Sequence, residues 1–497
     1  MRVYVLFLRG LRRKNAENEA DWEIFLEGCG AQMSILWLYT VNIFLIIAVV
    51  CFQRKEPVGA MAWVLCFIVL PVLGPVIYLV FGLGLKHRTK KKYLEKANAS
   101  LAFATNRQNA PEPEKYLHMI KYFENTAHSV FTDKNDVKVY TSAEKKYEDL
   151  LDDIKNAKET VNLLYFIIHN DEIGKKLLSL LADKAEEGVQ VRFLYDGFGS
   201  IMTPYKTFRR LKNNPNGHVA AFFPLNIFSY SLINHRNHRK LAIIDGKIAY
   251  MGGMNIGDEY MGKKRPTPWR DTHMRIVGQA VSEVQRIFCL DWEFTTGEDI
   301  KNNSALFFKK PVPVGRSLPM QIVASGPDST CEEIKCGMIK MLSHAKDYAF
   351  LQTPYFAPDV PFLDAIKTAA QSGVDVRVMI PSVPDKKYVY YTTMSYMDEL
   401  LAAGVRVYLY PGFIHSKTLV CDDEVCTIGT TNIDTRSFLL HFEINAFMYS
   451  REESVRNRNI FLADQEKSYE LTMEIYKKRG IPNIMKEGFF RLFAPIM

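Results

Sequence analysis

The sequence predicts a mixed α/β fold, in which two repeated α/β sandwich domains follow an N-terminal two-helix transmembrane hairpin. Three observations carry this prediction. Two long apolar runs lie close together near the N-terminus, and one short pattern of residues occurs twice further along the chain. Around both copies, apolar runs of strand length alternate with amphipathic helical stretches, which is typical of a sheet covered by helices. We therefore expect a membrane anchor followed by a duplicated α/β body.

The bulk composition fits a globular protein with an anionic partner. The 497 residues are 48% hydrophobic and 24% charged, and the formal net charge is +8, which favours nucleic acid or lipid headgroups without choosing between them. The eight cysteines are scattered, and their spacings match no usual zinc pattern. We therefore predict free or structural thiols, no metal and no cofactor.

Two apolar runs predict the hairpin. The run at residues 35–52 contains only Asn42 as a strongly polar residue, and at about 1.5 Å per residue it spans roughly 27 Å, nearly one hydrocarbon thickness. A second run follows at residues 59–84, where Pro71 and Pro75 predict a kink. A secretory signal peptide is the weaker interpretation, because a second apolar run follows at once and no small-residue cleavage site intervenes. A buried hairpin inside a soluble domain is the other alternative.

The distribution of Lys and Arg predicts how the hairpin is oriented. Both flanks are rich in these residues, whereas the turn between the helices carries only Arg54 and Lys55. By the positive-inside rule, both ends lie in the cytoplasm. We expect a multi-pass protein of the cell membrane, with the domains after the hairpin on the cytoplasmic side. Met33 is an alternative start, and the basic cluster after the hairpin would still outweigh the turn.

Changes in composition divide the chain into five parts. A charged linker interrupted by prolines follows the hairpin and would hold its Lys and Arg against anionic headgroups. A strand–helix–strand order then occurs twice, and GVQVR at Gly188 echoes GVDVR at Gly373. The segment 302–319 breaks the pattern between the halves. The predicted parts are a leader at 1–34, the hairpin at 35–84, the linker at 85–130, a first domain at 131–310 and a second domain at 311–497.

One pattern occurs twice in a single register. The first copy, HRKLAIIDGKIAYMGGMN, starts at His238, and the second, HSKTLVCDDEVCTIGTTN, starts at His415. Subtraction gives 415 − 238 = 177. The same offset relates Lys240 to Lys417, Asp245 to Asp422, Gly252 to Gly429 and Asn255 to Asn432. Matched positions in one rigid register indicate a duplicated domain.

Each copy places an imidazole and an ammonium group on the same surface. Residues two apart in a strand point to the same face, so His238 and His415 each lie beside the lysine two positions later. Asp245 and Asp422 stand where hairpin turns are expected. Their alternative role is to accept a hydrogen bond from an imidazole and fix its tautomer.

These groups suit a phosphoryl centre. The lysines neutralise non-bridging oxygens, and the amides of Asn255 and Asn432 donate to them, so no metal is required. One neutral histidine can attack phosphorus to give a phosphohistidine, while the second, protonated, serves the departing and incoming hydroxyls. We expect the two titrations to be pushed apart, with one histidine neutral and one charged near pH 7. A metal at His235 and His238 is disfavoured by the adjacent Arg and Lys.

The paired HxKxxxxD pattern, each copy followed by a GxxN-type segment, resembles the phospholipase D superfamily. Within it, the chain resembles the bacterial cardiolipin synthases over nearly its whole length, including the N-terminal hairpin. The resemblance extends to YDGFGS at Tyr195, WRDTHMRI at Trp269, DWEF at Asp291, TPYFAPD at Thr353 and GTTNIDTRSF at Gly429. One departure is His441, where the family commonly has Asn.

The resemblance implies two phospholipase D-like α/β sandwich domains and a phosphatidyltransferase. A histidine would attack one phosphatidylglycerol, glycerol would leave, and a second phosphatidylglycerol would take the phosphatidyl group to give cardiolipin. By similarity His238 would be the nucleophile and His415 the acid and base, although the repeat itself does not distinguish them. The implied site comprises catalytic His238, Lys240, Asp245, His415, Lys417 and Asp422, phosphate-binding Asn255 and Asn432, and supporting Gly252, Gly253, Gly429, Ser437 and Glu443.

Other functions stay open from the sequence. A phospholipase D-type hydrolase, or a transferase using another headgroup such as phosphatidylethanolamine, would use the same motifs. A membrane-anchored nuclease would explain the basic charge but not the apolar helices. A non-catalytic scaffold is disfavoured by the intact motifs. The expected partners are phosphatidylglycerol, cardiolipin and the bilayer, with no nucleic acid, and the oligomeric state stays open.

Overall fold

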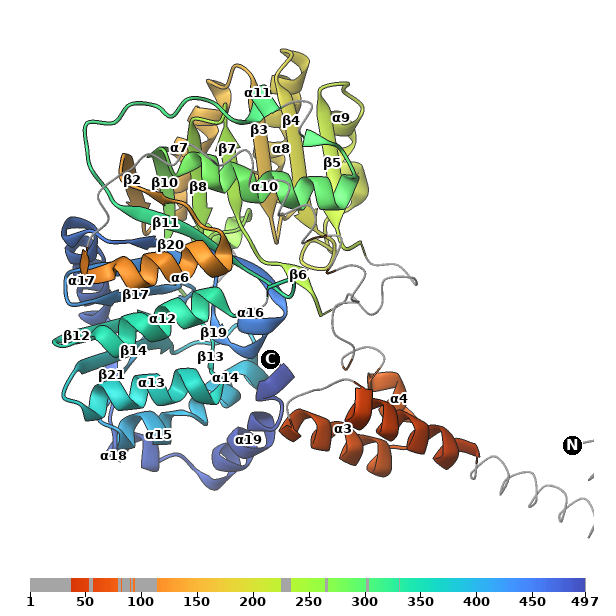
Figure 1. The fold of residues 1–497 in the computed structure, drawn as a ribbon, viewed down its shortest axis with the longest axis vertical. Coiled ribbons are helices and arrows are strands. Elements are labelled where there is room, and N and C mark those ends of the chain that lie inside the picture. The colour runs from red at the N-terminus through yellow and green to blue at the C-terminus, as the bar shows by residue number, and fades with distance from the viewer. Residues whose placement is uncertain are drawn as a thin grey trace, which may run out of the picture. The chain divides into compact units, whose positions relative to one another are not determined.

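The chain forms two compact units, Met1–Gly84 and Leu85–Met497, in the computed structural model (Figure 1). The structure describes residues 37–52, 57–78, 82, 90, 93, 114–224, 234–263, 267–300, 304–329 and 331–496. The predicted leader, the turn with Arg54 and Lys55 and most of the basic cluster after the hairpin lie outside the described residues.

The first unit is helical and apolar. Its described elements are a helix at residues 37–47, a π-helix at Ala48–Phe52, α3 at Pro57–Val69 and α4 at Leu73–Ile77. The break between α3 and α4 falls at Pro71, as the prolines predict, because proline cannot donate the next helical hydrogen bond. Asn42, the polar residue of the first run, donates from Nδ2 to the Pro71 carbonyl at 2.9 Å. Among the residues that the structure describes, no helix combines the length and the apolar character needed to cross a membrane.

The second unit contains a seven-stranded sheet in the order β2-β10-β8-β7-β3-β4-β5. Its strands are β2 (Asn135–Tyr140), β3 (Thr160–Tyr165), β4 (Gln190–Asp196), β5 (Gly217–Phe222), β7 (Leu241–Ile244), β8 (Ile248–Gly252) and β10 (His273–Gly278). The β3, β4 and β5 strands are parallel, and the remaining neighbours are antiparallel. The helices of this half are α7 (Ala143–Lys155), α8 (Glu172–Glu186), α9 (Arg209–Lys212), α10 (Val281–Thr296) and α11 (Ser304–Phe307).

A second sheet follows the order β1-β11-β20-β18-β17-β12-β14-β15-β21, with β6 attached to β20. Its strands are β1 (Phe131–Thr132), β6 (Arg236–Asn237), β11 (Met320–Ser325), β12 (Tyr348–Gln352), β14 (Asp375–Pro381), β15 (Arg406–Tyr410), β17 (Thr418–Cys421), β18 (Val425–Gly429), β20 (His441–Met448) and β21 (Tyr469–Leu471). Four short strands pair outside the sheets or between the halves: β9 (Trp269–Arg270) with β16 (Phe413–Ile414), and β13 (Phe356–Ala357) with β19 (Ile433–Asp434).

The helices of the second half are α12 (Glu333–His344), α13 (Val360–Gln371), α14 (Lys387–Met394), α15 (Met397–Ala402), α16 (Thr435–Leu439), α17 (Arg451–Gln465), α18 (Met473–Lys477) and α19 (Ile481–Arg491). The segment predicted as a linker contributes α6 (Leu117–Ala127). Its apolar face packs on the second sheet, where Phe123 meets Phe447 with ring centroids 4.6 Å apart. The β1 strand, just before the first sheet in sequence, pairs with β11 of the second.

Both sheets share one topology, which reflects the duplication. The order β10-β8-β7-β3-β4-β5 corresponds to β20-β18-β17-β12-β14-β15, and each pair of neighbours has the same relative direction in both sheets. The β7–β8 and β17–β18 hairpins carry the two copies of the repeated pattern. Equivalent strands therefore hold equivalent chemical groups.

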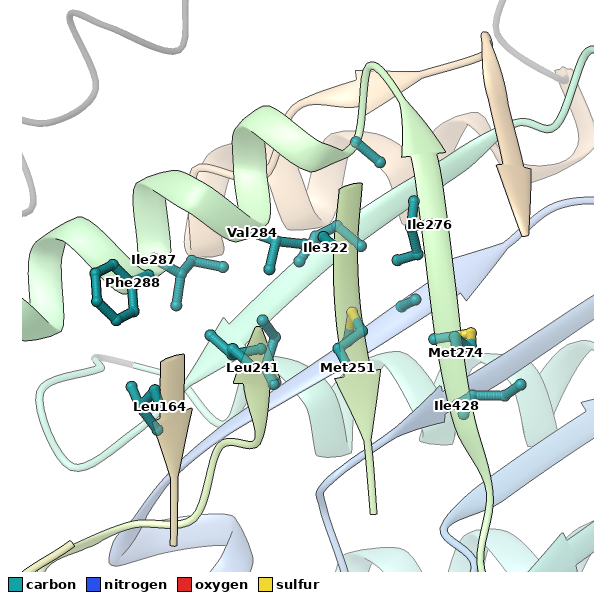
Figure 2. Close-up of a cluster of buried hydrophobic side chains, with 14 of the residues drawn as sticks. Leu164, Leu241, Met251, Met274, Ile276, Val284, Ile287, Phe288, Ile322 and Ile428 are labelled. Carbon is teal, nitrogen blue, oxygen red and sulfur yellow. The ribbon is translucent and has the colours of Figure 1, made fainter. Parts of the chain in front are cut away.

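The core consists of layers set by the alternation of side chains along each strand. In β3, Leu163 faces α7 and α8, whereas Leu164 belongs to the cluster between the two sheets. Figure 2 shows that cluster, where Val284 and Ile287 of α10 lie over strands of the first sheet, and Ile322 and Ile428 come from the second. Because one core joins both sheets, the two halves pack as a single body.

Candidate active site

Each repeated histidine is held by a short strand that pairs with the opposite half. The β6 strand runs parallel to β20, and the β16 strand runs parallel to β9. At the end of each pairing a histidine amide donates one more hydrogen bond, from His238 to the Phe442 carbonyl at 2.9 Å and from His415 to the Arg270 carbonyl at 2.6 Å. Each imidazole therefore lies beside a carboxylate of the other half.

Two histidine–carboxylate dyads result. His238 Nδ1 lies 2.9 and 3.0 Å from the two carboxylate oxygens of Glu443, and His415 Nδ1 lies 2.7 Å from Asp271 Oδ2. Both dyads are buried. When a carboxylate accepts a hydrogen bond from Nδ1–H, the proton of the neutral imidazole stays on Nδ1. Nε2 then keeps its lone pair and can face a substrate.

The carboxylates are themselves anchored. The Thr430 hydroxyl donates to Glu443 Oε2, and the Thr272 amide donates to Asp271 Oδ1 at 2.7 Å. Glu443 stands among the predicted supporting residues, whereas Asp271 was not singled out by sequence reasoning. The only signal was its place within the phrase WRDTHMRI.

The two lysines lie under the histidines. Lys240 Nζ donates to the His238 carbonyl, and Lys417 Nζ donates to the His415 carbonyl at 2.5 Å. Burial lowers the pKa of Lys417 to about 8, with nearby carboxylates opposing the shift. Burial, together with the charge of Lys417, lowers the pKa of Lys240 well below its ordinary value. A bound phosphate anion would favour the charged form of both lysines.

The pKa values of both histidines are lowered, whereas the sequence predicts one neutral and one charged histidine near pH 7. Burial, and then the charge of Lys240, lowers the pKa of His238 well below its usual range. Burial and Lys417 lower the pKa of His415 to about 4, against the opposing effect of Asp271. Burial raises the pKa of Glu443, and the charge of Lys240 opposes the shift. Burial and a lysine act alike on each imidazole, so the expected separation of the two titrations is not seen here; a bound anionic substrate would raise both pKa values.

The repeated aspartates hold the hairpins rather than the imidazoles. Asp245 accepts the backbone amides of residues 158–160 at 2.7–2.9 Å, and Asp422 accepts those of residues 346–348 at 2.8–3.0 Å. Both adopt positive φ, 51° and 54°, a conformation that aspartate tolerates in turns. The alternative that they fix an imidazole tautomer is therefore wrong, since Glu443 and Asp271 do so.

The repeated glycines make room for these contacts. A Cβ on Gly253 would lie 2.1 Å from Asp271 Oδ1, and one on Gly429 would lie 2.0 Å from Asn445 Oδ1. Asn445 Oδ1 in turn accepts the Thr430 amide at 3.2 Å. Gly252 has φ of 147°, and its Cβ would lie 2.6 Å from the Cα of the neighbouring β10 residue. Any side chain at these positions would displace the strands that carry the dyads.

The predicted asparagines and serine occupy different environments. Asn255 Oδ1 accepts the Ile167 amide at 3.0 Å, and its Nδ2 donates to the Tyr260 hydroxyl at 2.6 Å. Within the described residues, Asn432 Oδ1 is buried and has no hydrogen-bond partner. Ser437 donates its amide to Asp434 at 2.7 Å and so belongs to the first turn of α16.

The walls around the two imidazoles differ. His415 is flanked by the rings of Trp269, Phe413 and Tyr260, with centroids 5.6, 5.7 and 6.3 Å away. His238 is flanked by Phe166 at 5.0 Å and by a further histidine, His441, at 5.7 Å.

A buried network supports the strand behind His238. Asn237 Nδ2 donates to Asp291 Oδ2 at 2.9 Å, and Arg239 donates to the same carboxylate at 2.7 Å. The Tyr93 hydroxyl donates to Asp291 Oδ1 at 2.7 Å. Because Asn237 and Arg239 flank His238 in sequence, this carboxylate fixes the histidine from both sides.

One group in the site has the donor set of a metal ligand cluster. The ligand atoms of His238, His441 and Glu443 all lie within 4.8 Å of one another. The positive charge of Lys240 lowers the pKa of all three groups. The same charge would repel a cation there. The cluster suits an anion at least as well as a metal.

Comparison with known proteins places this geometry in context. A family model described as cardiolipin synthase, PLD-like domain, matches residues 150–292 and 338–465. A second model, described as phospholipase D-nuclease N-terminal, matches residues 41–82. A cardiolipin synthase from Oceanobacillus iheyensis is 39% identical, covering 92% of this chain and 98% of that protein. One from Staphylococcus aureus is 40% identical, covering 92% and 95%, and one from Listeria monocytogenes is 40% identical, covering 93% and 98%.

A solved structure shares the fold. The phosphatidylserine synthase of Haemophilus influenzae superposes with a TM-score of 0.56 at 13% identity, covering 76% of this chain and 100% of that one. At this identity the likeness concerns the fold of the α/β body alone.

Proposed function

Because this chain belongs to the family of phospholipase D-like cardiolipin synthases, we propose that it transfers a phosphatidyl group between two phosphatidylglycerol molecules. The products are cardiolipin and glycerol. The pair of crossed histidine–carboxylate dyads, each above a buried lysine, is the observation that carries the proposal. This arrangement offers two imidazoles and two cations to one phosphodiester.

The reaction proceeds in two displacements at one phosphorus. His238 Nε2 attacks the phosphorus of the first lipid, and His415 gives a proton to the departing glycerol oxygen. The phosphatidyl group is then held on His238 as a phosphohistidine. His415 next removes the proton of the hydroxyl of the second lipid, which attacks phosphorus and frees His238. The assignment of His238 as nucleophile rests on the family resemblance.

The surrounding residues supply charge and orientation. The ammonium groups of Lys240 and Lys417 neutralise the non-bridging oxygens, whose charge grows in the transition state. Glu443 and Asp271 orient the imidazoles and stabilise their charged forms. Burial of both dyads keeps bulk water from the phosphohistidine. The exchange of one phosphodiester for another needs no nucleotide.

A membrane location is part of the proposal. We place the N-terminal segment as a two-helix hairpin in the cell membrane, with the α/β body on the cytoplasmic side, and the match of residues 41–82 to the N-terminal family model supports this. A second support is α19 with the residue that follows it. Ile481, Met485 and Phe489 of the helix and Leu492 directly after it are exposed at helical spacing, Met485 at 70% and Leu492 at 77%. Accessibility of single cysteines to a membrane-impermeant reagent in spheroplasts tests the topology, and labelling of body residues from outside would contradict it.

Product analysis with purified protein in phosphatidylglycerol vesicles tests the proposed reaction. We expect a four-chain lipid and one glycerol for each turnover. Release of phosphatidic acid alone would instead identify a phospholipase D-type hydrolase. A product that retains another headgroup, from phosphatidylethanolamine for example, would identify a transferase of different specificity.

A further inference from the structure

The two half-sites differ in the residues where their short strands pair. Where β6 pairs with β20, Arg236 stands opposite His441. Where β16 pairs with β9, Phe413 stands opposite Trp269. The offset of 177 that relates the two repeated patterns also relates Arg236 to Phe413. The duplicated architecture thus presents a basic pair beside His238 and an aromatic pair beside His415.

A third basic residue completes the group beside His238. Arg436, in the first turn of α16, directs Nε at His441 Nε2 over 3.3 Å. Nδ1 of His441 has no hydrogen-bond partner among the described residues, and Glu443 Oε1 lies 3.8 Å from it. Arg436 is partly exposed, and the His441 side chain is 13% exposed. The His441 ring lies 5.7 Å from that of His238.

The residues of the basic group lower one another's pKa values, although Asp196 and Asp434 oppose the shifts of the two arginines. Burial, then the charges of Arg436 and Lys240, lowers the pKa of His441 well below its usual range. Burial, with the charge of Arg436, lowers the pKa of Arg236 although Asp196 opposes the shift. Asp196 lies 3.8 Å from Arg236. Burial lowers the pKa of Arg436, and the charge of Asp434 opposes that shift. An anion placed among these residues would relieve the mutual repulsion.

The proposed reaction brings a second anion close to the reacting phosphorus. The hydroxyl that attacks belongs to a glycerol whose other end carries the acceptor lipid's own phosphodiester. Two phosphates are therefore separated by one three-carbon bridge, both in the attacking complex and in the product. Of the two flanks, only the one beside His238 offers cationic side chains, so we expect the second phosphate to lie on that side.

We propose that Arg436, His441 and Arg236 form the subsite for the acceptor lipid's phosphodiester. This inference rests on the proposed function and adds the basis of acceptor choice. Arg436 contacts the second phosphate. His441 donates a hydrogen bond to that phosphate or links it to the His238–Glu443 dyad. Arg236 adds positive charge from the buried side. Water and free glycerol lack this anion, so the subsite favours phosphatidylglycerol over both as acceptor.

Acceptor competition tests the subsite. Full-length protein in phosphatidylglycerol mixed micelles is given labelled glycerol or labelled glycerophosphoglycerol, the deacylated form of the lipid, which carries the phosphate without acyl chains. Both acceptors draw on the same phosphatidyl-enzyme, so their product ratio isolates the acceptor step. We expect Arg436→Gln to lower transfer to glycerophosphoglycerol and to phosphatidylglycerol about tenfold relative to transfer to glycerol, the size of one lost charge-assisted hydrogen bond.

Matched variants separate recognition from folding. Arg436→Lys should retain part of the preference for phosphate-bearing acceptors. Arg406→Gln removes an arginine of β15 that pairs with Glu470, and it should leave the product ratio unchanged. A fall of all acceptors by the same factor in Arg436→Gln would overturn the subsite and leave Arg436 a structural role. Absence of cardiolipin with the unchanged protein would instead refute the proposed function.

Discussion

The His238 and His415 half-sites have the same backbone construction and different surroundings. In each, a two-residue strand crosses to the opposite half, an imidazole meets a carboxylate through Nδ1, and a lysine donates to the histidine carbonyl. Around this shared frame, one flank is basic and the other aromatic. The shared frame supports the chemistry at phosphorus. The different flanks can distinguish the two alcohols that exchange there.

Removal of either imidazole should have the largest effect and should separate their roles. We expect His238→Ala and His415→Ala each to lower turnover by about 10³-fold or more, since each removes a group that acts in both displacements. Because the P–N bond of a phosphohistidine is acid-labile, the reaction with phosphorus-labelled lipid is stopped in sodium dodecyl sulfate at mildly alkaline pH. The protein should then retain label on His238 in His415→Ala and none in His238→Ala. Label on His415 in the His238 variant would reverse the two assignments.

Removal of the carboxylate charge should be the next largest effect, and should be similar in the two half-sites. We expect Glu443→Gln and Asp271→Asn each to lower kcat by about 10²-fold, because an amide can stabilise neither the charged imidazole nor the required tautomer. The KM for lipid should change little. An effect confined to one variant would show that only one dyad needs its carboxylate during turnover.

The repeated aspartates should affect stability more than chemistry. Asp245→Ala and Asp422→Ala each leave three backbone amides without their acceptor, which should cost about 2–3 kcal/mol of unfolding free energy. Thermal unfolding in detergent measures the loss, and kcat of the folded protein should stay within a few-fold of the original. A loss of kcat as large as that of Glu443→Gln would restore these residues to the catalytic group.

Acid should weaken the folded state modestly through the buried histidines. The folded pKa of His415 is about 4, below the value of about 6.5 for an unfolded histidine. The unfolded chain therefore binds more protons between these values, and stability falls as the pH drops from 6.5 towards 4. His415→Asn should remove part of this dependence, measured as the change in Tm between pH 7 and pH 5. An identical pH dependence in both proteins would contradict the lowered pKa.

The sequence predicted the parts of the site that depend on local spacing. The strand–turn–strand frame lies where the pattern indicates. The histidines and their lysines were expected within a strand, but they stand in the segments just before β7 and β17. The partnership of His238 with Glu443, and of His415 with Asp271, could not be derived from spacing, because each joins distant parts of the chain across the two halves. Asp245 and Asp422 misled for the same reason, since proximity in sequence suggested a contact that the fold gives to other carboxylates.

The crossing of the dyads bears on the origin of the chain. Neither half contains a complete histidine–carboxylate pair, because each imidazole takes its partner from the other half. An ancestor of half this length could have built the same pairs only as a two-fold dimer, with every pair shared between subunits. In a single chain the two copies are free to differ in sequence. Each flank could then acquire its own residues, basic at Arg236 and aromatic at Phe413, which a dimer of identical subunits cannot do.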